Sequence, residues 1–389
     1  MRVYLDHAAT TPMLPAAREA WIDAMGLVGN PSSIHSHGQN AKRMLEESRE
    51  RIAASLGCDA IEIVFTSGGT ESVNLAIKGL YWARVAADPD RRRILAPRGE
   101  HHATVDTLEW LERHEGAIVE WVPVDEFGRV SIETLAALLA ARSDTALVTL
   151  LWANNEVGTI QPVAEVAALA AEHGVPVHAD AVAAYRHVAI DFAASGLAAL
   201  SVSAHKIGGP LGMGALALSR KATIVPLIHG GGQQRQVRSG TQDAPSALAF
   251  AVAAEHPSAQ LAALRDKLIG GVRAAVPAAI LRGDPQHRLD NNAHFTFPGC
   301  EGDSLLFLLD AAGVSASTGS ACQAGIPEAS HVLIGMGLGE QDARGALRFT
   351  LGHTSTEADV DALIAALPHA YERAVRAGLA TRDTLRGAR

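Results

Sequence analysis

The spacing of apolar residues changes repeatedly along the first two thirds of the chain. Short apolar runs predict strands, and apolar residues at helical spacing predict helices between them. The predicted strands are 61–65, 93–96, 118–124, 146–152, 175–180, the run before Lys206, and 214–218. The predicted helices are 41–56, 73–83, 103–114, 131–142 and the segment from Pro162 to Gly174. This alternation predicts a mainly parallel sheet with helices on both faces.

The last third of the chain predicts a smaller unit in which strands and helices are mixed. A helix from about residue 243 leads into a second helix at 259–275, and further elements lie near 292–297, 305–309, 332–336 and 348–351. Residues 1–14 predict an extended arm that packs on this unit, and residues 382–389 predict a frayed end. We therefore expect a large α/β domain at 15–255 and a small α+β domain formed by 1–14 and 256–389.

Composition and charge narrow the class of protein. Of the 389 residues, 48% are hydrophobic and 19% are charged, which is typical of a folded globular protein. The net charge is −9 and the longest basic run is Arg91–Arg93, which argues against nucleic acid as the main partner. No apolar run reaches the roughly 18 residues of a membrane helix, and the first residues lack a signal-peptide core. We expect a cytoplasmic protein that binds neither nucleic acid nor membrane.

The three cysteines do not predict a disulfide framework. Cys58, Cys300 and Cys322 form no CxxC pair and no even set. Cys58 follows a glycine at a helix end and Cys300 lies in a Pro-Gly turn, so packing explains both of them. The histidines at 35, 37, 101 and 102 lack the spacing of a zinc-protease motif, and we expect no metal site.

Polar and glycine residues gather where the predicted parallel strands end. Ligands of open α/β sheets collect at these carboxyl ends. The run Thr66–Ser72 joins a strand to a helix through two glycines, which suits an anion site, although an ordinary capped helix has the same pattern. A second glycine loop, Arg238–Thr241, carries a hydroxyl that suits a phosphate. The strand ends carry Gly69, Thr70, His101, Asn155, Asp180 and Lys206.

Lys206 is the residue with the clearest chemical potential. It follows a buried strand and precedes Gly208, and desolvation of its ammonium group would lower its pKa and make the amine nucleophilic. Asp180 ends the preceding predicted strand. Pyridoxal phosphate requires a lysine for its Schiff base and an acid at its ring nitrogen. The alternative is a lysine at a surface turn and an aspartate that caps a helix.

Three further stretches carry a family resemblance. They are Tyr4–Pro12, Asn154–Gly158, and Ser317–Cys322 followed by Arg348–Gly352. With the lysine loop, they resemble the cysteine desulfurases of the NifS/IscS kind, within the class V aminotransferase group, nearly end to end. The resemblance implies the pyridoxal-phosphate fold type I and a pyridoxal 5′-phosphate cofactor. It also implies conversion of L-cysteine to L-alanine, with the sulfur passed to Cys322 as a persulfide for iron–sulfur cluster or other sulfur-containing product synthesis.

The resemblance also implies roles for individual residues. Lys206 matches the Schiff-base lysine, Asp180 matches the partner of the ring nitrogen, and His101 matches the histidine that stacks on the ring and handles protons. Asn155 and Arg348 match residues that hold the substrate carboxylate, as the planar guanidinium suits. Further phosphate and cofactor contacts are implied for Gly69, Thr70, Ser203 and His205.

Two implied partners follow from the same resemblance. Thr241 matches a phosphate ligand that reaches in from the other subunit, which implies a homodimer. Cys322 matches the sulfur acceptor, and a protein that later takes the sulfur is the implied second partner.

One position departs from the family pattern. The family usually reads Asp-Ala-x-Gln here, but Ala183 stands at the position of the glutamine. The lost hydrogen bond corresponds to about 0.5–1.5 kcal/mol, and a water molecule or Tyr185 could replace it. Two alternatives therefore stay open: another pyridoxal-phosphate C–S or C–Se lyase in a specialised pathway, or a non-catalytic sulfur-trafficking paralogue.

Overall fold

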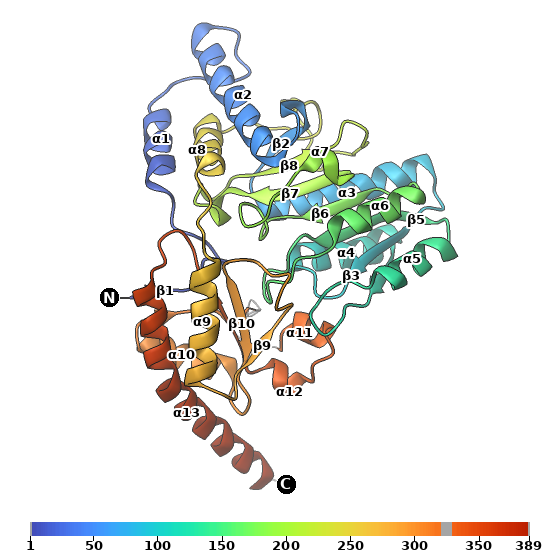
Figure 1. Ribbon diagram of the computed structural model, residues 1–389. Helices are drawn as coiled ribbons and strands as arrows, with labels where there is room; N and C mark the ends of the chain where they lie inside the picture. Colours follow the sequence, from blue (N-terminus) through green and yellow to red (C-terminus); the bar gives the residue numbers. More distant parts are fainter. Residues whose placement is uncertain (1, 320–328, 388–389) are drawn as a thin grey trace.

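The larger sheet of the protein has seven strands and is mainly parallel (Figure 1). The computed structural model describes residues 2–319 and 329–387. β8 is antiparallel to both of its neighbours, and the other adjacent strands are parallel. This confirms the predicted α/β sheet. The strand order is β2 (Ile63–Thr66), β8 (Gly214–Leu218), β7 (Ala199–Ser203), β6 (Val177–Asp180), β5 (Thr145–Leu151), β3 (Arg93–Pro97) and β4 (Ile118–Val122).

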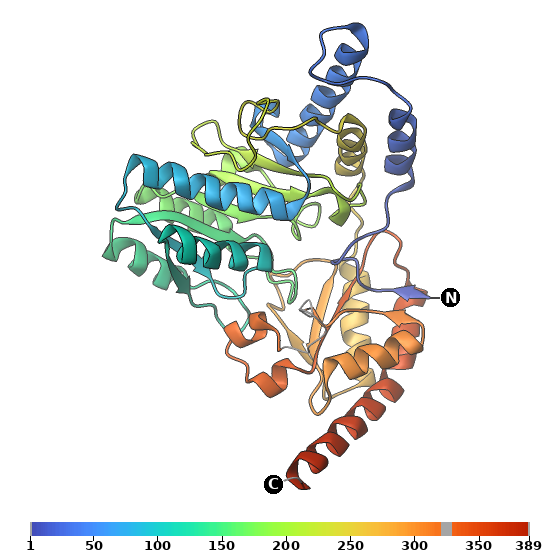
Figure 2. The ribbon, with the colours of Figure 1, turned by 180° about the vertical axis from the view of Figure 1, so that it is seen from behind.

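Helices cover both faces of this sheet because alternate strand residues point to opposite sides. Leu95 and Val148 belong to one hydrophobic core, and their neighbours Ile94 and Leu147 belong to another. One face carries α3 (Gly69–Ala87) and α4 (His102–Glu115), as Figure 2 shows. The opposite face carries α5 (Ile132–Ala141), α6 (Val163–Glu172) and α7 (Phe192–Ser195).

A group of three helices packs at the β2 end of the sheet. It consists of α1 (Pro15–Met25), α2 (Ser36–Leu56) and α8 (Ala244–Glu255). α2 begins five residues earlier than expected, because the His35 ring accepts a hydrogen bond of 3.3 Å from the Gly38 N–H and caps the helix. It ends as predicted at Gly57, whose φ of 65° lies in the left-handed region.

A second, three-stranded antiparallel sheet forms the core of the smaller unit. Its order is β12 (Ala346–Thr350), β10 (Asn292–Thr296) and β9 (Ile280–Arg282). Phe295 and Phe349 pack here with residues from α9 (Ala262–Ala275), α10 (Gly302–Ala311) and α13 (Glu357–Gly387). This core is separate from those of the large sheet, so we retain the proposed division into 15–255 and 1–14 with 256–389.

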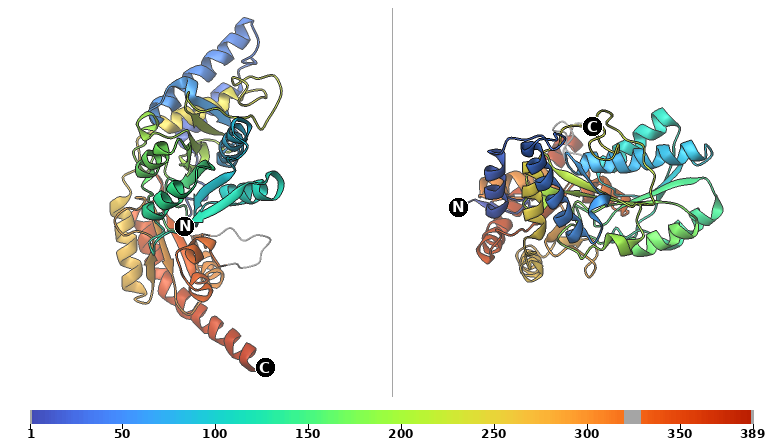
Figure 3. Two further views of the ribbon diagram at one scale, coloured as in Figure 1. Left: turned by 90° about the vertical axis from the view of Figure 1, so that its right-hand side faces the viewer. Right: turned by 90° about the horizontal axis from the view of Figure 1, so that it is seen from above.

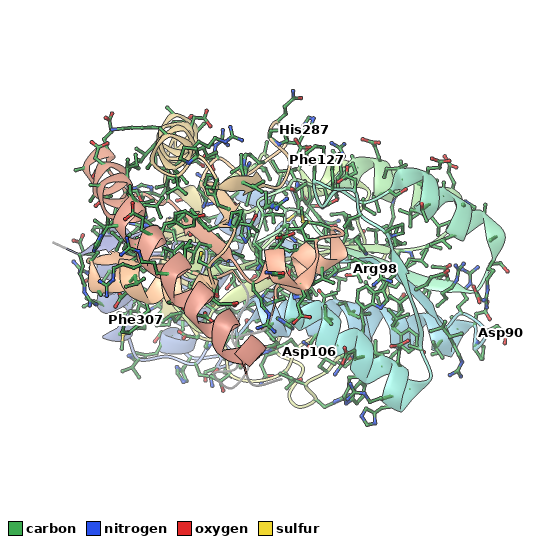
Figure 4. All side chains as sticks on the ribbon, turned by 90° about the horizontal axis from the view of Figure 1, so that it is seen from below. Asp90, Arg98, Asp106, Phe127, His287 and Phe307 are labelled. Atoms are coloured by element: carbon green, nitrogen blue, oxygen red, sulfur yellow. The ribbon has the colours of Figure 1, made fainter. Side chains whose placement is uncertain are left out.

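The C-terminal end differs from the expectation. We predicted a frayed segment at 382–389, but α13 continues as a helix to Gly387 and extends away from the rest of the molecule (Figure 3). Two short helices, α11 (His331–Gly335) and α12 (Glu340–Ala343), lie beside the smaller sheet, below the large sheet in Figure 1. Arg98, which is labelled in Figure 4, packs against Gly335 of α11. No helix within the described residues has the length and apolar character needed to cross a membrane.

The N-terminal arm connects the two units. β1 (Val3–Tyr4) pairs in parallel with β11 (Val314–Ser315) of the smaller unit, which confirms that the arm packs there. The arm then reaches the lysine loop, where the Thr11 N–H donates to the His205 carbonyl at 3.2 Å and the Leu14 N–H donates to the Gly208 carbonyl at 2.9 Å. Residues 5–14 therefore lie beside both units.

Candidate active site

A cavity of about 350 Å³ opens at the carboxyl ends of the parallel strands. Of the residues predicted to form the site, nine line this one cavity: Gly69, Thr70, His101, Asn155, Asp180, Ser203, His205, Lys206 and Arg348. Further lining residues that the sequence did not single out include Ala8, Ala9, Leu151, Val182 and Ser317. The convergence expected from the strand ends is therefore present in the fold.

Lys206 lies in a short 3₁₀ helix directly after β7. The chain turns back at Gly208, where φ is 82° and a Cβ atom would lie 2.7 Å from Leu14 Cγ. The lysine amine donates hydrogen bonds to the carbonyl of Ala8 and, at 3.0 Å, to the carbonyl of Ala9. Burial lowers the pKa of Lys206 to about 8, and the positive charge of Arg348 adds to this effect. About a tenth of the amine is therefore uncharged at pH 7.

Asp180 is the last residue of β6, where it pairs with Leu151 on one side and Ser201 on the other. It is 3% exposed, and its Oδ1 atom accepts a hydrogen bond of 2.9 Å from the Val182 N–H. Burial raises the pKa of Asp180 to about 6, although that hydrogen bond and the charge of Lys206 oppose the shift. A buried carboxyl with this pKa gains from a cationic partner in the cavity.

His101 caps the start of α4 and faces the cavity. Its Nδ1 atom accepts a hydrogen bond of 3.0 Å from the Ala103 N–H, so the neutral ring carries its proton on Nε2. Desolvation lowers the pKa of His101 to about 4, and the positive charge of Lys206 contributes in the same direction. In this arrangement His101 offers an N–H donor to the cavity, and it accepts a proton only when the capping bond breaks.

The start of α3 lies at one end of the cavity and has features that suit an anion. At Gly69 a Cβ atom would lie 2.8 Å from Val182 Cγ2, so the absence of a side chain keeps the space beside Val182 open. The hydroxyl of Ser203 is buried, lines the cavity and has no hydrogen-bond partner among the described residues. An unpaired buried donor beside the positive end of a 19-residue helix fits a phosphate group. His205, two residues after Ser203, also lines the cavity, and its Nδ1 contacts Thr10 Oγ1 at 3.2 Å.

Arg348 and Asn155 meet on the side of the smaller unit. Arg348 is 4% exposed, and its Nη1 donates to the Asn155 carbonyl at 2.9 Å. Its Nη2 donates to Asp6 Oδ1 at 2.8 Å. Arg348 Nε and Asn155 Oδ1 are buried and have no partner in the described part of the chain. Sequence reasoning missed Asp6, because no pattern placed the arm opposite residue 348.

Glu156 was also missed, although it belongs to a stretch that carried the resemblance. It is 2% exposed and its Oε2 atom accepts a hydrogen bond from the Ser330 hydroxyl. A Cβ atom on Gly319 would lie 3.3 Å from the same oxygen. Glu156 is therefore bonded to Ser330 and lies close to Gly319, on the two sides of residues 320–328.

The predicted sulfur acceptor Cys322 falls within residues 320–328 and lies outside the described residues. The chain before it is placed, since Ser317 exchanges two backbone hydrogen bonds with Arg348, of 3.2 and 2.6 Å. The other two cysteines, Cys58 and Cys300, are free thiols. Burial raises the pKa of both thiols to about 12, so neither forms a thiolate readily.

The alanine at position 183 lines the cavity, as its place in the sequence implied. Tyr185 was one expected substitute for the absent glutamine, and this expectation is wrong. Its hydroxyl is hydrogen-bonded to Ser55, and its ring packs edge-on against Phe250 in the core. Tyr185 is therefore held away from the residues that line the cavity.

Two predictions from the sequence concern Thr241 and the absence of a metal site. Thr241 is exposed and is not among the described residues that line the cavity of its own chain. No group of three histidine, cysteine, aspartate or glutamate residues with metal-binding geometry occurs in 2–319 and 329–387.

Comparison with known proteins defines the class. The chain matches the aminotransferase class-V family over residues 3–363, and it belongs to this family. Members of the family generally depend on pyridoxal 5′-phosphate.

Within that family the chain belongs with the IscS/NifS cysteine desulfurases. It is 55% identical to the IscS-like cysteine desulfurase of Mycobacterium tuberculosis, with 97% of this chain and 98% of the relative covered. It is 41% identical to cysteine desulfurase IscS of Methanosarcina thermophila, with 95% and 92% covered. The solved structure of a NifS-like protein from Rickettsia africae superimposes with a TM-score of 0.85 at 31% identity, covering 96% of this chain and 100% of that one.

Proposed function

We propose that this protein is a pyridoxal-phosphate-dependent cysteine desulfurase that converts L-cysteine to L-alanine and receives the sulfur on Cys322. One observation carries the proposal: a single cavity brings together an amine (Lys206), a buried acid (Asp180) and a guanidinium (Arg348). Ser317, on the segment that leads to Cys322, lines the same cavity. A related protein has been solved under the description "SspA in complex with cysteine", at 32% identity and a TM-score of 0.81, with 91% of this chain and 100% of that chain covered.

The residues of the cavity fit pyridoxal 5′-phosphate. The orphaned Ser203 hydroxyl, the open approach at Gly69 and the neighbouring Thr70 and His205 would hold its phosphate. Asp180 would hold its ring nitrogen, because a cation there relieves the cost of the buried carboxylate. When bound, the cofactor supplies an electron sink for the substrate carbon that carries the amino group.

Two groups bind and activate the substrate. Arg348, supported by Asn155, holds the carboxylate of L-cysteine, and its unpaired buried Nε is a donor available for that purpose. Lys206, with a pKa of about 8, removes the proton from the substrate carbon as a base and later returns a proton.

Sulfur transfer is a displacement at the substrate sulfur. The Cys322 thiolate attacks this sulfur, so an S–S bond forms and the C–S bond breaks. The electron pair of the broken bond stays with the substrate carbon, which takes up a proton to give alanine. L-cysteine plus the Cys322 thiol therefore become L-alanine plus the Cys322 persulfide, without an external oxidant or reductant. His101 is the proposed acceptor of the thiol proton, which requires its Nδ1 to leave the Ala103 N–H.

We also propose that the active form is a homodimer in which Thr241 of one subunit contacts the phosphate in the other. Thr241 is exposed on its own chain. The connection between α1 and α2 exposes Leu27, Val28 and Ile34, which suits burial against a second copy. A sulfur-acceptor protein that collects the persulfide sulfur is the second proposed partner, and the cytoplasm is the proposed location.

Mass spectrometry can test the proposed transfer of sulfur from L-cysteine to Cys322. Purified protein loaded with pyridoxal 5′-phosphate is incubated with L-cysteine, and the Cys322 peptide is weighed by mass spectrometry while alanine is quantified. The expected result is one added sulfur atom on this peptide and an equal amount of alanine in the first turnover. Cys322→Ala is the matched variant, and Cys300→Ala is the control. Alanine and sulfide release by Cys322→Ala at the unchanged rate would contradict the proposal.

A further inference from the structure

The N-terminal arm forms one wall of the cavity through its backbone. The Lys206 amine donates hydrogen bonds to the carbonyls of Ala8 and Ala9, the latter at 3.0 Å. Both alanines line the cavity. Backbone carbonyl groups make these contacts, so the residue types at positions 8 and 9 do not indicate the interaction.

Thr350, at the end of β12, holds this part of the arm. Its hydroxyl accepts a hydrogen bond of 2.9 Å from the Ala8 N–H. Its backbone N–H donates to the Leu5 carbonyl at 2.8 Å, and its carbonyl accepts from the His7 N–H at 3.4 Å. The Ala9 N–H donates to the Asp6 carbonyl at 3.1 Å, which closes a turn. The peptide groups on both sides of Ala8 are therefore fixed.

The side chain of Thr350 is fully enclosed, at 0% exposure. A buried hydroxyl that accepts a backbone N–H cannot be replaced by a methyl group without leaving that N–H unpaired. Replacement of Thr350 by valine therefore removes the hydroxyl that accepts the Ala8 N–H, while it keeps the shape of the residue nearly constant.

We infer that Thr350 is a positioning residue that sets the N-terminal arm so that the Ala8 and Ala9 carbonyls hold the reactive amine of Lys206. The inference rests on the proposed function only in taking Lys206 as the reactive amine. The contact between arm and amine is a property of the protein chain itself.

Charged groups face the amine from several elements. Burial, and after it the charge of Arg348 of β12, lower the pKa of Lys206, whereas Asp6 of the arm and Asp180 of β6 raise it. His101 and His205 also face the amine, because the charge of Lys206 lowers the pKa of each ring. Carbonyl oxygens that accept from an ammonium group favour its charged form. Loss of the two carbonyls therefore moves the pKa of Lys206 below its present value of about 8.

The test measures this pKa directly in the cofactor-free protein. Trace acetylation across a range of pH, followed by mass spectrometry of the Lys206 peptide, reports the fraction of uncharged amine. Thr350→Val is expected to lower the Lys206 pKa by about one unit, which raises the uncharged fraction of the amine at pH 7 roughly fivefold, from about a tenth to about a half. Thr350→Ser keeps the hydroxyl and is expected to restore the wild-type profile.

Thr296→Val is the matched control. Thr296 is a buried threonine of β10 in the same sheet, and its hydroxyl accepts a hydrogen bond of 2.8 Å from Arg282 Nε. This variant is expected to leave the Lys206 profile unchanged. A wild-type profile in Thr350→Val, or an equal fall in Thr296→Val, overturns the inference. Should Thr350→Val fail to fold, Thr350→Cys takes its place, since its thiol is a weaker acceptor; a smaller fall supports the inference and no fall overturns it.

The outcome is independent of the desulfurase assay. A lowered pKa in Thr350→Val together with a failed persulfide experiment would retain the arm contact and reject the proposed function. A normal persulfide yield with no change in the Lys206 pKa of Thr350→Val would retain the proposed function and reject the role of Thr350.

Discussion

The guanidinium of Arg348 donates a 2.8 Å hydrogen bond to the carboxylate of Asp6, although 342 residues separate them in the chain. This ion pair joins β12 of the smaller unit to the arm that contacts Lys206. Both side chains are largely buried, so loss of either partner leaves an uncompensated charge in the interior, which is strongly destabilising. The arm thus has a direct electrostatic connection to the proposed carboxylate-binding residue.

Replacement of Arg348 by lysine is expected to weaken substrate binding. Lysine keeps the charge but loses the planar fork that contacts Asn155 and Asp6. The loss of a charged hydrogen bond corresponds to about 1.5–3 kcal/mol, or roughly a 10- to 100-fold rise in KM for L-cysteine. Steady-state kinetics check this, with Arg344→Lys as the control, because Arg344 pairs with Glu340 on the surface of α12. An unchanged KM in Arg348→Lys would remove this residue from the substrate site.

Replacement of Lys206 by methionine is expected to stabilise the cofactor-free protein. Folding lowers the pKa of Lys206 from 10.5 to about 8, so the charged amine opposes folding below pH 8. The shift corresponds to about 3 kcal/mol, and the cost disappears as the pH rises from 8 past 10.5. Denaturant unfolding at several pH values should show Lys206→Met more stable at pH 7 and the difference shrinking toward pH 10. Lys42→Met, on an exposed face of α2, is the control. A constant difference across this range would contradict the shifted pKa.

Cys58 and Cys300 are expected to resist alkylation in the folded protein. Burial raises the pKa of both thiols from 9 to about 12, so each thiolate is roughly a thousandfold scarcer than in an exposed cysteine. Treatment with iodoacetamide at pH 8, followed by peptide mass spectrometry, should leave both unlabelled. In denaturant both should react at the rate of an ordinary thiol. Rapid labelling of Cys300 in the native protein would show that it is a second reactive cysteine.

The sequence predicts the large sheet and much of the cavity for one physical reason. Parallel strands end at the same edge, so residues such as Asp180 and Lys206, which follow buried runs, are brought together by the topology alone. Periodicity does not show which distant segments meet, and the pairing of Asp6 with Arg348 therefore escaped prediction. The contacts of Ala8 and Ala9 could not be predicted, because they are made by backbone carbonyl groups, which every residue type has.

One missed helix and one misplaced helix start show the same limit at a local scale. α1 was missed because its buried positions are only Ala17 and Ala24, which give almost no periodic apolar signal. The start of α2 was placed late because its cap is His35, which is not among the usual capping residues. Thr241 remains a prediction, since its proposed contact requires a second chain.

Replacement of Gly352 by alanine is expected to detach the arm from the smaller unit. A Cβ atom at this position would lie 2.0 Å from His7 Nδ1, and the His7 ring is buried and bonded to Thr11 Oγ1 at 2.6 Å. The ring cannot move without breaking that contact, so Gly352→Ala should cost about 1–3 kcal/mol in the free energy of unfolding. Gly339→Ala is the matched control, because a Cβ atom there meets nothing within 4 Å. The double variant His7→Ala with Gly352→Ala should recover part of the loss, since it removes the clash; a purely additive cycle would show that the two residues do not meet.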